Sequence, residues 1–231
     1  MSTESNTGID GDQCAQLARD NGWLWHAARQ DGAGSATATL ILAHGAGAPM
    51  DSDFMNDIAA RLALQGVSVM RFEFPYMAQR RTGGGKRPPN PQGQLLDCWR
   101  EVYGQVRPHV TGPLAIGGKS MGGRMASLLA DELKVDGLVC LGYPFYAVGK
   151  PEKPRVAHLA QLRVPTLIVQ GERDALGSRE AVAGYALSPA IEVLWIPTAN
   201  HDLKPLKASG LNQAQCLETT AVAVAQFLRR G

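Results

Sequence analysis

Short apolar runs alternate with segments of helical periodicity along most of this chain, and this alternation restricts the fold more than any other feature. Residues 138–141 and 166–169 form continuous runs, a pattern typical of parallel strands that helices cover on both faces. Helical spacing of apolar residues separates such runs. The order β-β-α-β-α-β-α-β-β-α-β-α predicts one α/β domain over residues 22–231, with a mostly parallel central sheet of about seven strands and helices on both faces.

Local composition leads to further expectations about single segments. Residues 1–21 are polar and rich in Gly, Asp, Ser and Thr, which predicts a flexible N-terminal tail with at most one helical turn. The runs 23–26 and 39–43 flank the turn-rich segment 30–34, so we expect them to form an antiparallel pair. Helices are expected where apolar residues recur at helical spacing, among them 121–133, 180–187 and 211–230.

Composition excludes several classes of protein. The 231 residues are 45% apolar, and 23 Lys and Arg against 21 Asp and Glu leave a net charge of +2. This balance excludes a chain that is disordered throughout and argues against a nucleic-acid-binding protein that depends on bulk charge. The four cysteines contain no CxxC pair, so neither a structural zinc site nor a disulfide-dense secreted scaffold is expected.

No part of the sequence resembles a targeting or membrane segment. The first sixteen residues lack both a basic start and an apolar stretch, so we expect no signal peptide. The longest apolar runs are of strand size, well short of the ~18 residues that a membrane helix needs. We therefore expect a cytoplasmic protein with no membrane partner.

The segment Gly118-Lys119-Ser120-Met121-Gly122 fits the GxSxG pattern. Apolar residues 114–116 precede it and a helical period follows it, which is the strand–turn–helix setting of a nucleophile elbow. Glycines are needed on both sides of the serine because a Cβ there would clash across the tight turn. A phosphate-binding loop is excluded, because GxxxxGK[ST] requires glycine at position 113, where Pro113 stands.

A serine nucleophile needs a base within hydrogen-bond reach and a carboxylate that orients the base. In a sheet of this kind both follow the serine in the chain, first the acid and then the histidine, on loops after strands. Asp174 and His201 each follow an apolar run by a few residues, and they are the predicted partners of Ser120. Glu172 and Asp202 remain as alternatives for the acid.

An oxyanion hole needs two backbone amides, one directly after the nucleophile and one from the loop after an early strand. Met121 supplies the first, and Ala46, in the loop His44-Gly45-Ala46-Gly47, is the expected second donor. A dinucleotide-binding turn is disfavoured, because GxGxxG would need glycine at position 50. His44 and Gly45 are candidate substrate-binding residues, and His44 either contacts the site or supports its loop.

With these motifs, residues 23–231 resemble the α/β-hydrolase superfamily in the order strand, HGxG, strand, GxSxG, Asp and His. The segments FPYM, GKSMGGR and NHDLKP are similar to a small capless branch that includes dienelactone hydrolases and the hydrolase-like domain of a eukaryotic chromatin-acetylation complex subunit. The resemblance implies a triad of Ser120, Asp174 and His201. Dienelactone hydrolases use a cysteine nucleophile, whereas position 120 is serine, so their substrate is not carried over.

The segment 144–164 is too short for the helical cap that larger relatives insert there. An open, shallow site follows, which disfavours a deep acyl-chain tunnel and hence a typical lipase. We therefore expect a serine hydrolase, a carboxylesterase or thioesterase, that cleaves a small ester or thioester through an acyl-enzyme without cofactor or metal. A peptidase ranks behind, because no residues mark a specificity pocket.

Residues 78–94 form a basic segment without acidic residues, carrying Arg80, Arg81, Lys86 and Arg87. Its glycines and prolines predict a mobile loop at the rim of the site, and a solvated surface loop is the alternative to a functional one. Such a loop attracts a carboxylate, a phosphate or an acidic protein, so Arg80 and Arg81 are candidate substrate-binding residues. The second hypothesis is a catalytically weak or silent interaction module that uses this segment as its contact surface.

Overall fold

The computed structural model describes residues 7–29, 38–83, 85 and 87–230. Its seven strands form one sheet in the order β1-β3-β2-β4-β5-β6-β7, in which only β1 is antiparallel to its neighbour in the described residues. The predicted α/β class and sheet are confirmed. The strands are β1 (Leu24–His26), β2 (Thr39–Ala43), β3 (Ser68–Phe72), β4 (Leu114–Lys119), β5 (Gly137–Leu141), β6 (Thr166–Gly171) and β7 (Ile191–Ile196).

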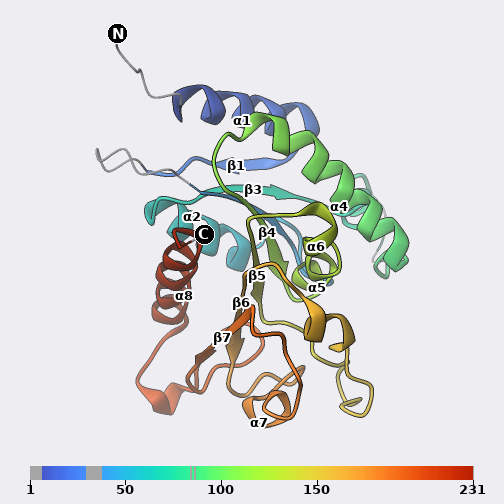
Figure 1. The fold of residues 1–231 in the computed structure, drawn as a ribbon, viewed down its shortest axis with the longest axis vertical. Helices are drawn as coiled ribbons and strands as arrows, with labels where there is room; N and C mark the ends of the chain where they lie inside the picture. Colours follow the sequence, from blue (N-terminus) through green and yellow to red (C-terminus); the bar gives the residue numbers. More distant parts are fainter. Residues whose placement is uncertain (1–6, 30–37, 84, 86, 231) are drawn as a thin grey trace.

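Helices cover both faces of the sheet. In Figure 1, α2 and α8 lie on one face, and α1, α4, α5 and α6 lie on the other. The helices are α1 (Thr7–Asn21), α2 (Asp53–Leu64), α3 (Pro75–Arg81), α4 (Gln92–Val106), α5 (Met121–Ser127), α6 (Ala130–Leu133), α7 (Arg179–Val182) and α8 (Gln213–Leu228).

Each central strand contributes to two cores. In β2, Leu40 and Leu42 pack into the core with α2 and α8, while Ile41 packs into the core that contains Trp99 of α4. Successive side chains of a strand point to opposite faces. Because both faces are buried here, no polar alternation is left in the sequence, which explains the continuous apolar runs.

The predicted antiparallel pair between 23–26 and 39–43 is wrong. β2 is already paired on both edges, with β3 and β4. β1 therefore pairs with the free edge of β3, where Trp25 lies opposite Met70. The turn-rich segment 30–34 lies outside the described residues.

Residues 7–21 form helix α1 rather than the expected flexible tail. Cys14 and Ala18, one helical turn apart, are almost fully buried against the sheet, and Leu17 packs beside them. The apolar stripe consists of small side chains among many polar residues, so its periodicity is weak in the sequence. Contacts with β1 and the 3-10 turn Arg107–His109 hold the helix in place.

Two predicted helices are shorter in the structure. The helix predicted over residues 121–133 is divided into α5 and α6. The Ser127 hydroxyl donates to the Arg124 carbonyl at 2.7 Å and so competes with the backbone hydrogen bonds of the helix. The period 180–187 contains only α7, which ends at Val182, shortly before Gly184. The C-terminal helix α8 agrees with its prediction and begins at an Asn212–Gln215 capping box.

The connection between β5 and β6, residues 142–165, carries one 3-10 helix of five residues, Ala157–Gln161, and no α-helix. The predicted absence of a helical cap over the carboxyl edge of the sheet is therefore confirmed. No helix in the described ranges is both long enough and apolar enough to cross a lipid bilayer.

Candidate active site

Ser120 lies at the sharp turn between β4 and α5. Its φ of 52° and ψ of −117° place a residue that is not glycine in strained backbone. A Cβ added at Gly118 would lie 2.6 Å from backbone atoms of Gly122 and Gly123, and one at Gly122 would lie 2.5 Å from the His44 carbonyl oxygen. The glycines are therefore required by the close approach of backbone, as the turn geometry predicted.

A continuous hydrogen-bonded chain joins Ser120, His201 and Asp174. His201 Nε2 lies 2.9 Å from Ser120 Oγ, and His201 Nδ1 lies 2.7 Å from Asp174 Oδ2. The carboxylate accepts a hydrogen bond from Nδ1–H, so the proton stays on Nδ1 and Nε2 is free to accept the serine proton. Asp174 is fully buried. This is the arrangement that a serine needs for activation as a nucleophile.

The two alternative acids have other partners. Glu172 accepts hydrogen bonds from the Arg179 side chain at 2.8 Å and the Thr198 amide at 2.9 Å. Asp202 pairs with Lys119 at 3.3 Å. Asp174 is the carboxylate that bonds to the His201 ring.

Gln170, at the end of β6, was missed in the sequence analysis. Its buried side-chain amide donates to Asp174 Oδ2 at 2.8 Å and to the Tyr143 carbonyl at 3.2 Å, and its oxygen accepts from the Tyr143 amide at 2.7 Å. The Leu176 amide donates to the other oxygen, Oδ1 of Asp174, at 2.8 Å. These bonds fix the carboxylate plane. A polar residue at the end of a buried apolar run was the available signal.

Lys119 is a second missed residue. Its ammonium donates to the His201 carbonyl at 2.9 Å, pairs with Asp202 and lies 5.6 Å from the centroid of the Phe54 ring. Burial lowers the pKa of Lys119, and the nearby Asp202 opposes this shift. The side chain thus ties the end of β4 to the loop that carries His201. A lysine at the end of a buried strand was the signal.

His44 supports the loop after β2 and has no ring nitrogen left for a substrate. It is fully buried. The Phe74 amide donates to its Nε2 at 3.1 Å, so Nδ1 carries the proton and donates to the Gly45 carbonyl at 2.6 Å. Burial lowers the pKa of His44, which favours this neutral form. Its candidate role as a substrate-binding residue is therefore wrong.

The loop held by His44 lies against Ser120. A Cβ added at Gly45 would lie 3.6 Å from Ser120 Cβ. The Tyr76 hydroxyl donates to the Ala46 carbonyl at 2.9 Å, and burial raises the pKa of Tyr76 to about 12. Tyr76 therefore stays a hydrogen-bond donor at neutral pH and fixes the loop from the side of α3.

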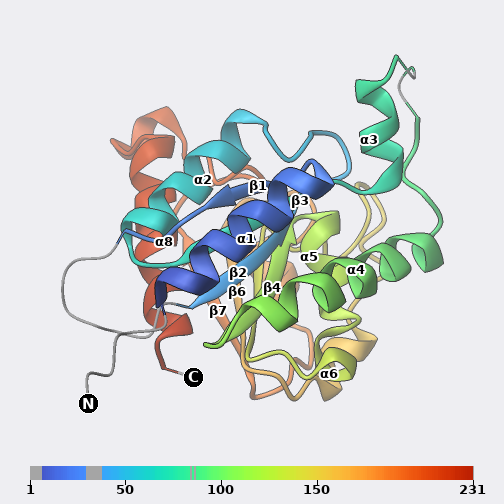
Figure 2. The same ribbon diagram turned by 90° about the horizontal axis from the view of Figure 1, so that it is seen from above.

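The basic segment 78–94 is only partly a loop, because Arg80 and Arg81 belong to α3 and residues 92–94 open α4. Figure 2 shows α3 near the end of the molecule where α4 begins. Arg81 pairs with Asp51 at 2.8 Å and Glu73 at 2.6 Å, so its charge is neutralised. Arg80 lies 5.3 Å from the centroid of the Tyr76 ring. Lys86 lies outside the described residues.

Solved structures share this fold. An α/β serine hydrolase homologue from Coxiella burnetii is 20% identical with a TM-score of 0.65, over 87% of this chain and 90% of that chain. An α/β serine hydrolase without lid from Xanthomonas campestris is 21% identical with a TM-score of 0.68, over 90% of this chain and 88% of that chain. Est1E from Butyrivibrio proteoclasticus is 16% identical with a TM-score of 0.64, over 89% of this chain and 91% of that chain.

A family model assigns the chain directly. The model described as alpha/beta hydrolase domain matches residues 36–229, which include β2 to β7 and the whole Ser120, His201 and Asp174 chain. The protein therefore belongs to the alpha/beta hydrolase family.

Proposed function

We propose that this protein is a serine hydrolase that cleaves a small ester or thioester through an acyl-enzyme. Ser120 attacks the carbonyl carbon, His201 takes the serine proton and later returns it to the leaving group, and Asp174 orients the imidazole and stabilises its protonated form. Water then attacks the acyl-enzyme with His201 again acting as the base. No metal or cofactor takes part in this scheme.

The observation that carries the proposal is the position of His201 between Ser120 Oγ at 2.9 Å and Asp174 Oδ2 at 2.7 Å. Both distances are within hydrogen-bond range before any substrate is bound. The strained backbone of Ser120 supports the same assignment, because strain at a functional turn presents the hydroxyl above the sheet.

We assign the oxyanion hole to the amides of Met121 and Ala46. Met121 opens α5, where the first amides have no partner within the helix and the helix dipole favours a negative charge. Ala46 belongs to the loop that packs against Ser120, and His44 and Tyr76 hold this loop. Removing one such donor typically lowers the rate by about 10²–10³.

The proposed substrate class follows from the architecture around Ser120. The β5–β6 connection has no cap helix to form an enclosed acyl-chain tunnel. An open site of this kind suits short acyl groups, so we infer carboxylesterase or thioesterase activity on small substrates.

The test is the intact mass after exposure to a fluorophosphonate. The folded protein should gain one adduct, whereas Ser120→Ala and denatured protein should gain none. In parallel, p-nitrophenyl acetate hydrolysis should fall about 10⁴-fold or more in Ser120→Ala or His201→Ala. Turnover that persists in Ser120→Ala would remove Ser120 from the mechanism.

The interaction-module hypothesis predicts the opposite results. It expects no adduct on the folded protein and loss of partner binding when Arg80, Arg81, Lys86 and Arg87 are neutralised, with no effect of Ser120→Ala. Arg81 contributes little to such a surface, since two carboxylates already pair with it.

A further inference from the structure

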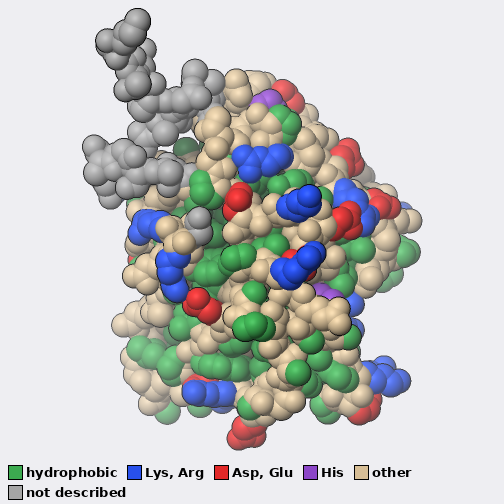
Figure 3. All heavy atoms as spheres, viewed as in Figure 1, with side chains coloured by type: hydrophobic (Ala, Val, Ile, Leu, Met, Phe, Trp, Pro, Cys, Tyr) green, Lys and Arg blue, Asp and Glu red, His purple; other side chains and the backbone are tan. Residues whose placement is uncertain are grey.

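Three segments that follow strands of the sheet are rich in basic residues. The segments 74–96, 121–127 and 142–158 follow β3, β4 and β5 and so begin at the carboxyl edge of the sheet. Together their sequences contain eight Lys and Arg but one acidic residue, Glu152. Of the eight, Arg81 pairs with Asp51 and Glu73 from outside these segments, and Lys86 lies outside the described residues. By contrast, acidic and basic side chains are interspersed over α4 and α6 on the face shown in Figure 3.

Arg124 lies one helical turn after Ser120. Its amide donates to the Ser120 carbonyl at 3.0 Å. Side chains of an α-helix lean toward its N-terminus, so the guanidinium of Arg124 extends back toward the Ser120 end of α5. Its bond to the side chain of Gln92, the first residue of α4, at 3.1 Å agrees with this direction.

Arg124 is not neutralised by a carboxylate in the described part of the chain. Its Nε atom is buried and has no hydrogen-bond partner there. Arg100 and Arg163 differ, since each pairs with a carboxylate. A buried guanidinium N–H without an acceptor is costly, and an oxyanion is the group that such a donor binds best.

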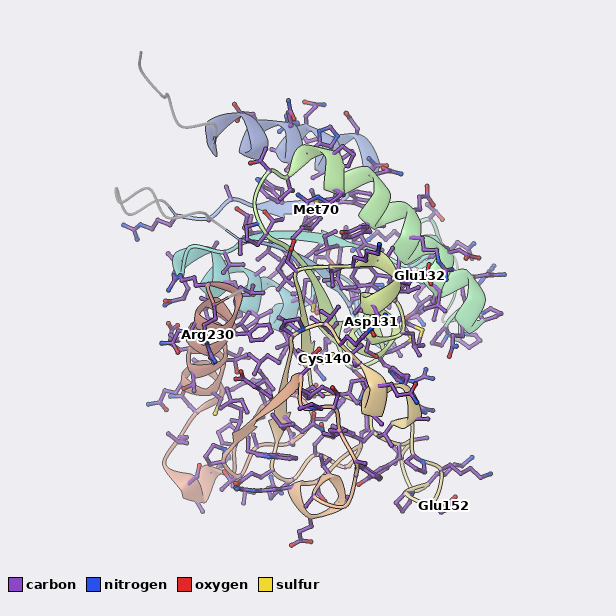
Figure 4. The ribbon with its side chains drawn as sticks, in the orientation of Figure 1. Met70, Asp131, Glu132, Cys140, Glu152 and Arg230 are labelled. Carbon is purple, nitrogen blue, oxygen red and sulfur yellow. The ribbon has the colours of Figure 1, made fainter. Side chains whose placement is uncertain are left out.

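A second arginine, Arg155, lies near α5, because its carbonyl accepts from Tyr143, whose hydroxyl lies 3.5 Å from His158 Nε2, and His158 Nε2 lies 2.8 Å from Ser127 Oγ of α5. Burial lowers the pKa of Arg124, and the positive charge of Arg155, on the β5–β6 connection, lowers it further. The side chain of Arg155 makes no ion pair within the described ranges. Glu152, the one acidic residue of this connection, lies at the outer tip of the loop (Figure 4).

Tyr143 and His158 are neighbours of the two arginines. The Tyr143 hydroxyl donates to the Arg155 carbonyl at 3.1 Å, and His158 Nε2 lies 2.8 Å from Ser127 Oγ. Burial raises the pKa of Tyr143, and burial together with Arg124 lowers the pKa of His158. At neutral pH Tyr143 therefore stays a neutral phenol and His158 a neutral imidazole, so neither adds a charge beside the arginines.

We propose that Arg124 and Arg155 form an anion subsite beside Ser120, and that the ester or thioester cleaved there carries a carboxylate or phosphate group that this subsite binds. Two guanidinium groups offer paired N–H donors to either oxyanion. The choice of substrate rests on the proposed hydrolase function, whereas the subsite is testable without catalysis.

The kinetic test compares matched substrates. For a carboxylate on the acyl group, p-nitrophenyl hemiglutarate is compared with p-nitrophenyl butyrate. For phosphates on the leaving group, butyryl-coenzyme A is compared with butyryl-N-acetylcysteamine. We expect the anionic member of one pair to have the higher kcat/KM. The ratio of kcat/KM for the anionic substrate to kcat/KM for its neutral counterpart should fall about 10- to 100-fold in Arg124→Gln or Arg155→Gln.

Arg163→Gln is the matched control. Like Arg155→Gln, it removes one positive charge from the β5–β6 connection. Because Arg163 is exposed and already pairs with Asp131, the ratio should not change. The ratio in the wild type should also fall with added salt, because screening weakens charge interactions. Equal ratios in the wild type and both subsite variants would overturn the proposal.

The binding test uses Ser120→Ala and so does not depend on turnover. Glutarate and inorganic phosphate are titrated separately while the arginine Nε–Hε signals are followed by NMR. The Arg124 signal should shift with one of the anions. In the double variant Ser120→Ala, Arg155→Gln, the Kd for that anion should rise about 10-fold or more. The anion that binds distinguishes carboxylate from phosphate.

Failure of this inference and failure of the proposed function give different results. Fluorophosphonate labelling without anion binding would overturn the subsite and keep the hydrolase. Anion binding without labelling or turnover would overturn the hydrolase and keep the subsite. Because Arg155 is exposed, Arg155→Gln remains informative even if Arg124→Gln does not fold.

Discussion

Gln170 Nε2 and His201 Nδ1 both bond to one atom, Asp174 Oδ2, at 2.8 and 2.7 Å. The histidine comes from the loop after β7 and the glutamine from the end of β6. The carboxylate that orients the imidazole is therefore itself oriented from the sheet. The same glutamine bonds to the backbone of Tyr143, so it connects the loops after β5 and β6.

Gln170→Ala should lower kcat by about 10- to 100-fold, because Asp174 loses the donor that fixes its plane. It should also lower the free energy of unfolding by about 1–3 kcal/mol, since the buried Asp174 oxygen and Tyr143 amide lose a partner. Steady-state kinetics and urea unfolding measure the two effects. The exposed Gln161→Ala is the control, and wild-type kcat in Gln170→Ala would contradict this role.

Lys119→Met should reduce kcat about 10-fold with little change in KM, because the ammonium donates to the His201 carbonyl and so acts through the position of the imidazole. Lys119→Arg should recover part of the rate, since a guanidinium also donates to a carbonyl. Asp202→Asn should have a smaller effect, because the Asp202 side chain is 66% exposed. A rise in KM alone would instead place Lys119 in substrate binding.

Ser120→Gly should be more stable to denaturant than Ser120→Ala by about 1–2 kcal/mol. Glycine relieves the strain of φ 52°, which is worth about 1–3 kcal/mol, but it also adds entropy to the unfolded chain. Urea unfolding of both variants gives the difference directly, and both should lack turnover. An alanine variant that equals or exceeds the glycine variant would show that the turn stores no strain.

The stability of the protein should fall as the pH drops from 7 toward 5, partly through His44. Burial lowers the pKa of His44 below its ordinary value of 6.5, so below that pH the unfolded chain binds a proton that the folded chain resists. The contribution of His44 to the free energy of unfolding is present above pH 6.5 and is lost as the pH falls toward the pKa of His44 in the folded protein. The pKa values of His26 and His158 are lowered as well and add to the same slope.

Urea unfolding at several pH values should therefore give a shallower slope for His44→Gln than for the wild type. One titrating group accounts for at most about 1.4 kcal/mol per pH unit. His109→Gln is the control, because this histidine bonds to the Gln13 side chain rather than to the loop beside Ser120. Identical slopes in the wild type and His44→Gln would contradict the prediction.

The order of strands and helices could be predicted because hydrophobic periodicity is local. Wherever a run was long and buried on both faces, as in β5 and β6, the prediction matched the structure. It failed where the apolar surface was small, as in α1, whose buried stripe includes Cys14 and Ala18. It also failed where a side chain interrupted the helix, as Ser127 does after α5.

The sequence by itself determined the α/β class, the glycine-flanked turn at Ser120 and the chain order in which an acid and a histidine follow it. These depend on local spacing and on the chemistry of single residues. Only the tertiary structure decided that His201 bonds to Asp174 rather than Glu172 or Asp202, that β1 joins β3 and that two carboxylates neutralise Arg81. Such choices depend on which strand edges and loops meet in space, and contacts between residues far apart in the chain leave no periodic signal in the sequence.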